Sequence, residues 1–278
     1  MQVSTIALYV VAILASLVSA QLGLNFASGY DFKVSAGNEV LRSETIYTPG
    51  AMEKNIKGIL FLWPGLWVPE NRTSGDLIQT VIEGSKTGRE CRGKPGQWCM
   101  APYVMHGVTR ADRDPRQYPV DPDGKIKIIY EKTADGASWN QTTIDMITGK
   151  RLQSYVGGKG KKTQFEFSTE MQYGNPGTTS MQLYTDTVIT LAKAEGMKFG
   201  VGRKKGSAVI SGVTSEQGGK VWKIASSHVT NEKSVQLMYD TDQVGLQNLA
   251  KSGTRWLAQP DPDGTGSFRG LSVLHVEE

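Results

Sequence analysis

The stretch Gly58-Ile-Leu-Phe-Leu-Trp63, followed at once by Pro64-Gly65, is the clearest structural signal in the chain. A short apolar run that is bounded by glycine and by Pro-Gly is typical of a buried β-strand ending in a turn, because a helix of this hydrophobicity would be longer. The stretch therefore predicts a β-rich fold in which this segment lies in the interior.

Similar extended segments recur on both sides of it. Residues 75–82 fit either a strand or a turn of helix, and 241–251 is the best helical candidate, weakened by Gly245. The remaining predicted strands are 101–106, 125–131, 138–145, 151–156, 164–171, 181–191, 208–213, 220–224, 234–239 and 271–276. Many short strands in a glycine-rich chain predict an all-β fold: an antiparallel two-sheet β-sandwich of the jelly-roll kind, or a barrel.

The first twenty residues are typical of a secretory signal peptide. Residues 1–20 carry no charged side chain, and their apolar run is shorter than the roughly 20 residues that span a bilayer. The run ends in Val18-Ser19-Ala20, which predicts cleavage before Gln21. An uncleaved anchor is the alternative. We therefore expect an extracellular protein with one domain, residues 21–278, and no membrane association after cleavage.

The charge of the chain bears on which macromolecules it can bind. The net charge of +4 is mild, and no nucleic-acid-binding motif accompanies it, so we expect no nucleic-acid partner. Two basic clusters, 159–162 and 203–205, lie beside glycines and predict solvated hairpin tips, or a surface that attracts an anionic polymer such as a polyuronide.

Cys91 and Cys99 are the only cysteines, and an exported protein is expected to pair them in a disulfide. Asn71 and Asn140 each begin an acceptor sequon for N-glycans. We expect no cofactor and no metal, although the two Asp-Pro-Asp-Gly turns, at 121–124 and 261–264, leave a calcium loop as an alternative.

Two tryptophans flank the Pro-Gly pair. Aromatic rings on a sheet edge or loop stack on the C–H faces of sugars, so Trp63 and Trp67 are candidate carbohydrate contacts. The alternative is that both rings belong to the core, since large aromatic residues dominate the cores of sandwiches.

Several segments resemble a family of secreted, mostly fungal proteins that are similar to concanavalin A-like lectin/glucanase sandwiches. The resemblance rests on Asn38-Glu-Val-Leu41, Gly58 to Leu66, Gly75-Asp-Leu-Ile-Gln79, and Trp139-Asn-Gln-Thr142 with Thr148-Gly149. It covers a little over half of the chain and implies a sandwich that acts on, or binds, an extracellular polysaccharide. Polysaccharide lyases and glucanases are the enzymes it implies.

The residues favour a lyase over a retaining glucanase. Glu166 and Glu170 lie about 13 Å apart along one strand face, whereas a retaining pair of carboxyl groups is separated by roughly 5–5.5 Å. A lyase needs an amide or histidine to neutralise a uronate and a tyrosine or histidine as base, so the candidate catalytic residues are Gln79, Tyr103 and His106. An offset of three places Tyr103 and His106 on opposite faces of a regular strand, which is a point against pairing them.

The candidate substrate-binding residues are Trp63, Trp67, Tyr130, Trp139 and Gln141. Three hypotheses about function stay open at this point. The first is a polysaccharide lyase or polysaccharide binder, the second a non-catalytic secreted interaction protein or effector, and the third a secreted-pathway protein that handles a small molecule.

Overall fold

The computed structural model describes residues 25–52, 56, 58–69, 75–84, 91–107, 110–172, 181–229, 255–260 and 268–274. Several predicted features lie outside the described residues: the predicted signal peptide 1–20, the sequon at Asn71, the strand 234–239, the helical candidate 241–251 and the Asp-Pro-Asp-Gly turn at 261–264. Within the described ranges, no helix is long and apolar enough to cross a membrane.

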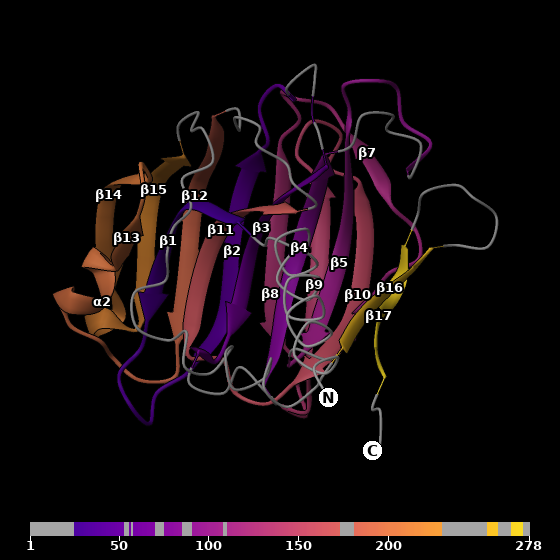
Figure 1. Ribbon diagram of the computed structural model, residues 1–278. Coiled ribbons are helices and arrows are strands. Elements are labelled where there is room, and N and C mark those ends of the chain that lie inside the picture. Colours follow the sequence, from indigo (N-terminus) through magenta and orange to yellow (C-terminus); the bar gives the residue numbers. More distant parts are fainter. Residues whose placement is uncertain are drawn as a thin grey trace, which may run out of the picture.

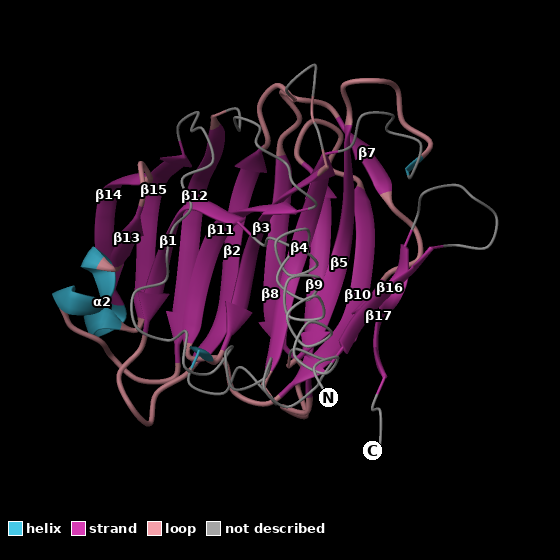
Figure 2. Ribbon diagram, viewed as in Figure 1, coloured by secondary structure: helices cyan, strands magenta, loops and turns pink. Residues whose placement is uncertain are grey.

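Two antiparallel sheets pack face to face (Figures 1 and 2), so the predicted two-sheet sandwich is confirmed. Sheet A has the order β13-β1-β11-β3-β4-β5-β6, with β7 also paired to β5. Its strands are β1 (Asn25–Lys33), β3 (Ile59–Trp67), β4 (Asp76–Gly84), β5 (Trp98–His106), β6 (Arg110–Arg113), β7 (Tyr118–Val120), β11 (Gln164–Gln172) and β13 (Arg203–Lys205).

Sheet B has the order β10-β9-β8-β2-β12-β15-β14. Its strands are β2 (Val40–Thr48), β8 (Ile126–Lys132), β9 (Ser138–Asp145), β10 (Arg151–Lys159), β12 (Gln182–Leu191), β14 (Val209–Glu216) and β15 (Val221–Val229). A short helix, α2 (Met197–Val201), a 3-10 turn, η3 (Gln217–Gly219), and a separate hairpin of β16 (Arg255–Pro260) and β17 (Phe268–Leu274) complete the elements.

The core lies between the sheets and is built from strands in which alternate residues point inward. On β11, Phe165 and Phe167 point into the core, and Ile128 and Tyr130 of β8 contribute to the same core from the other sheet. The ring of Phe167 stacks on Tyr184 of β12 at a centroid distance of 4.6 Å. Because successive residues of a strand point to opposite faces, the even-numbered residues of β11 point away from this core.

The Pro-Gly pair does not end a strand. Strand β3 continues through Pro64 and Gly65 to Trp67, and all nine of its residues pair with β11. The predicted turn is therefore wrong. A tyrosine hydroxyl from the other sheet donates a hydrogen bond to the carbonyl oxygen of Pro64, as described below.

Both basic clusters differ from the predicted hairpin tips. Lys162 is fully buried and forms an isolated bridge with Val40. Residues 203–205 form strand β13, and Lys205 makes ion pairs with Asp31 and Glu166. The other four basic residues of the two clusters are exposed, so the prediction of solvated side chains is wrong for Lys162 and Lys205 alone.

The disulfide between Cys91 and Cys99 is present, as predicted. It closes a short loop ahead of β5, whose first residue, Trp98, is fully buried. A disulfide suits a protein that folds in an oxidising compartment, so this bond fits an extracellular protein.

Lys162 gives a prediction about stability and pH. Its ammonium donates to the carbonyl oxygen of Lys159 at 2.6 Å, and burial lowers its pKa to about 8, against the opposing effect of Asp76. The unfolded chain therefore binds one more proton than the folded chain between about pH 8 and pH 10.4, so stability contributed by this group rises with pH across that window.

We expect Lys162→Met to be more stable than the wild type at neutral pH by about 1–3 kcal/mol, because the variant no longer buries a charge. The advantage should shrink as the pH approaches about 10. Urea unfolding at the two pH values measures it, with the exposed neighbour variant Lys161→Met as control. A difference that stays constant with pH would contradict the prediction.

Candidate active site

A row of seven residues, polar except for one glycine, crosses sheet A from edge to edge. Each residue lies directly opposite the next one on the neighbouring strand. Its members come from β13, β1, β11, β3, β4, β5 and β6 in that order: Arg203, Asp31, Glu166, Gly65, Gln79, Tyr103 and Arg113. Directly opposite residues of an antiparallel sheet point to the same side. We call this set the polar row.

The polar row lies on the face of sheet A that is turned away from the core. The alternate residues on three of its strands, Phe167, Leu66 and Ile78, belong to the core cluster. The row residues themselves are nevertheless well covered, since Glu166 is 2% exposed and Gln79 is 6% exposed. Buried polar side chains away from a core need partners or a function.

Glu166 is held by three donors. The indole N–H of Trp67 donates to Oε2 at 3.1 Å, the amide of Gln164 donates to the same oxygen at 2.8 Å, and Lys205 Nζ lies 2.5 Å from Oε1. Lys205 also lies 3.4 Å from Asp31. Contacts from three directions fix the orientation of this carboxylate, which is a requirement for a group that must meet a reacting atom.

Gly65 separates Glu166 from Gln79 and offers no side chain between them. A Cβ at Gly65 would approach Ile78 O to 2.9 Å and Leu77 Cδ1 to 3.1 Å, so a larger residue does not fit without movement. Two strand spacings place the Cα atoms of Glu166 and Gln79 about 10 Å apart. Their side chains therefore lie on either side of Gly65, and we call the position between them, which carries no side chain of its own, the slot.

Two polar atoms beside the slot have no hydrogen-bond partner in the structure: Oε1 of Gln79 and Nε1 of Trp63. Trp63 lies two residues before Gly65 on β3 and shares its face. Each of these two atoms can form a hydrogen bond with a ligand that reaches it, since an unsatisfied buried polar atom costs about 1–3 kcal/mol. The slot thus holds a fixed carboxylate on one side and an amide on the other.

Tyr103 and Arg113 extend the polar row beyond Gln79. Arg113 donates to the Tyr103 hydroxyl at 3.0 Å, and its guanidinium lies 5.7 Å from the ring centre. Burial and, secondarily, the charge of Glu83 raise the pKa of Tyr103, while Arg113 opposes this shift. A tyrosine with a raised pKa stays protonated at neutral pH, so its hydroxyl is not available as a base.

The structure brings together Gln79, Tyr103, Trp63 and Trp67 on one face of sheet A. His106 points to the opposite side of β5, where its ring nitrogens lie 2.9 Å from Asp76 and 3.0 Å from Asp112. It therefore does not share the slot.

Three predicted binding residues lie between the sheets. Tyr130, Trp139 and Gln141 are at most 1% exposed, and their polar atoms reach backbone oxygens of Pro64, Gly160 and Tyr103, respectively. They do not border the slot. Asn140, on the same strand as two of them, is partly exposed, and its glycosylation stays a prediction.

Glu166, Asp31 and Lys205 are site residues that the sequence alone did not predict. The alternation of β11, with phenylalanines at 165 and 167, was sufficient to place Glu166 on the face away from the core. Asp31 and Lys205 carried no such signal, because only the strand order places them beside Glu166.

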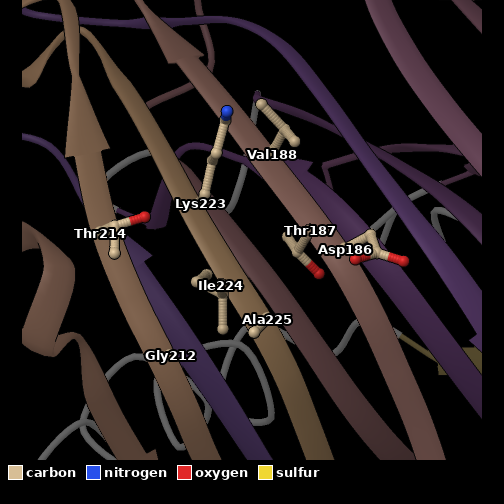
Figure 3. A pocket seen from close by; sticks show the side chains of 8 residues that line it. All are labelled: Asp186, Thr187, Val188, Gly212, Thr214, Lys223, Ile224 and Ala225. Carbon is tan, nitrogen blue, oxygen red and sulfur yellow. The ribbon is translucent and has the colours of Figure 1, made fainter.

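Sheet B carries a shallow hollow on its surface (Figure 3), lined by Asp186, Thr187, Val188, Gly212, Thr214, Lys223, Ile224 and Ala225. Its shape follows from the backbone. Asp186 on β12 and Gly212 on β14 both have a positive φ, 51° and 64°, and both lie level with Ala225 of the strand between them. The hollow shares no residue with the polar row. Within the described ranges, no cluster of three or more His, Cys, Asp or Glu side chains could hold a metal ion.

No family model matches this sequence, and no curated protein matches it. Among solved structures, the chain is similar to Scytalido-glutamic peptidase bound to a peptide-based transition-state analog, with 12% identity over 73% of this chain and 98% of that chain and a TM-score of 0.45. It is also similar to SCP-B, a member of the Eqolisin family of peptidases, in a complex with the tripeptide Ala-Ile-His, with 13% identity, the same coverage and a TM-score of 0.44. The resemblance to concanavalin A-like proteins stays a prediction.

Proposed function

We propose that the protein is an extracellular hydrolase that adds water to the carbonyl carbon of an amide, with peptides as the substrate class. One observation carries this proposal. Glu166 and Gln79 lie on either side of Gly65, on one face of three adjacent strands, with Glu166 fixed by three donors and the Nε2 amide group of Gln79 as the donor on the other side.

The two side chains supply the two functions that amide hydrolysis requires. Glu166 accepts a proton from a water molecule, whose oxygen bonds to the carbonyl carbon above Gly65. The side-chain amide of Gln79 donates a hydrogen bond to the oxygen that becomes negatively charged. The C–N bond then breaks, and the proton on Glu166 passes to the departing nitrogen.

Glycoside hydrolysis fits the polar row less well, because it needs two carboxyl groups that both reach the substrate. Asp31 is the carboxyl nearest in register to Glu166, but it lies one strand further from Gly65 and pairs with both Arg203 and Lys205. Glu166 is therefore the only carboxyl of the polar row that is directly opposite Gly65. The raised pKa of Tyr103 likewise disfavours a lyase that uses this tyrosine as its base.

Polysaccharide binding is the second candidate function, and one observation favours it. Trp67 is half-buried on the same face as Gln79, and its indole N–H is tied to Glu166, so the ring is fixed beside the slot. A fixed, partly exposed indole suits stacking on a sugar. Trp63 is only 5% exposed and offers little ring surface.

A panel of probes separates these functions. Mature protein, residues 21–278, is incubated with fluorescein-labelled casein, with polygalacturonate and with insoluble β-glucan, and the double variant Glu166→Gln/Gln79→Leu serves as the inactive comparison. We expect the wild type to release soluble fluorescent peptides and the double variant to release none. Formation of unsaturated uronate, retention on glucan without any product, or no cleavage of casein at any pH tested would each overturn the proposal.

A further inference from the structure

The hydrogen-bond ladder between β3 and β4 is interrupted next to the slot. The two strands pair from Leu60 to Leu62 and again at Gly65 and Leu66, but not at the two positions between. In the uninterrupted register Pro64 would lie opposite Thr80. Proline has no N–H to donate, so a normal pair of ladder bonds cannot form there.

A tyrosine from the opposite sheet occupies the interruption. Tyr130 of β8 crosses the core, accepts a hydrogen bond from the Thr80 N–H at 2.6 Å and donates one to the Pro64 carbonyl oxygen at 2.8 Å. Burial raises its pKa well above the ordinary value, so the hydroxyl keeps the proton that it donates. One hydroxyl thus satisfies a backbone donor and a backbone acceptor that a closed ladder would have paired with each other.

The two backbone groups that it bridges adjoin the slot. Pro64 precedes Gly65, and Thr80 follows Gln79, so the separation of Pro64 from Thr80 sets how far Gln79 lies from Gly65. We propose that Tyr130 is a positioning residue of the active site, whose hydroxyl holds β3 and β4 apart so that Gln79 faces Glu166 across the glycine. This inference rests on the proposed function of the Glu166 and Gln79 pair.

The fold supplies a matched control. Tyr47 is also fully buried, and its hydroxyl has no hydrogen-bond partner in the structure. Tyr47→Phe therefore removes a buried hydroxyl from the same core without touching the backbone of β3 or β4. If the loss of any buried hydroxyl lowered kcat, both variants would be affected. If the Tyr130 hydroxyl positions the site, only Tyr130→Phe has a lowered kcat.

The experiment compares casein cleavage by the wild type, Tyr130→Phe, Tyr47→Phe and the double variant Pro64→Ala/Tyr130→Phe. We expect Tyr130→Phe to lower kcat about 100-fold with KM within a few fold, because a small displacement of an aligned group has an effect of this size. Residue 64 regains an N–H in the double variant, so the ladder can close. We expect its melting temperature to recover while its kcat stays low.

Two results would overturn the inference: recovery of kcat together with melting temperature in the double variant, or wild-type kcat in Tyr130→Phe. A second readout does not depend on turnover. In NMR spectra, Tyr130→Phe should shift the side-chain amide signals of Gln79 and the backbone signal of Gly65, and Tyr47→Phe should leave them in place. If the signals shift in Tyr130→Phe but the wild type cleaves no casein, the proposed function alone is refuted. If the signals do not shift in Tyr130→Phe, the positioning role is refuted.

Discussion

Glu166→Gln is expected to lower kcat for peptide hydrolysis by about 10²–10⁴-fold, the contribution typical of a general base. Glutamine keeps the shape of the side chain and can still accept from Trp67 and Gln164, but it cannot take a proton from water. The substitution also removes the partner of Lys205, which retains its contact with Asp31. We therefore expect KM to change little and the fold to survive, as checked by initial rates and circular dichroism.

Glu170→Gln is the control for this prediction. Glu170 lies on the same strand and the same face, four residues further on, opposite Phe61 rather than Gly65. Its replacement removes one negative charge from the same surface, so it reproduces any general electrostatic effect. Equal losses of kcat in the two variants would show that Glu166 has no particular role in proton transfer.

The sequence was informative where chemistry is local. The hairpin at 138–145 and 151–156 is present as β9 and β10, and the Asp-Pro-Asp-Gly turn at 121–124 precedes β8, with the Gly124 N–H donating to the Asp121 carbonyl oxygen. Each of these depends on residues that are close together in the chain. The disulfide is another local feature, since its cysteines are eight residues apart.

The site was harder to predict, because it depends on which strands become neighbours. Asp31, Glu166 and Lys205 are far apart in the sequence and meet only because β1 lies between β11 and β13. Tyr130 and Tyr103 are both tyrosines on strands, so their sequence surroundings do not separate them. The Tyr130 side chain crosses the core, whereas Tyr103 lies on the face of sheet A that is turned away from the core.

Pro64-Gly65 shows the same limit at a single position. Proline and glycine in sequence favour a turn when only local geometry is considered. Here Tyr130, a residue 66 positions away, binds the carbonyl oxygen of Pro64 and the N–H of Thr80, and the missing side chain of Gly65 leaves the slot between Glu166 and Gln79. A long-range contact therefore converts a turn signal into the centre of a strand.

Phe167→Ala is expected to give the largest loss of stability among single substitutions on β11, about 3–5 kcal/mol in the free energy of unfolding. The ring is 1% exposed, stacks on Tyr184 at 4.6 Å and lies 6.1 Å from Tyr30, so its removal leaves a cavity between the sheets. Ser168→Ala, one residue on, changes the opposite face and should alter stability by less than about 1 kcal/mol. Urea unfolding of both variants measures the difference. Phe167 is adjacent to Glu166 but points the other way, so Phe167→Ala should keep the kcat of the wild type wherever it remains folded. A lowered kcat in fully folded Phe167→Ala would show that the core and the slot are coupled and that the two faces of β11 do not act independently.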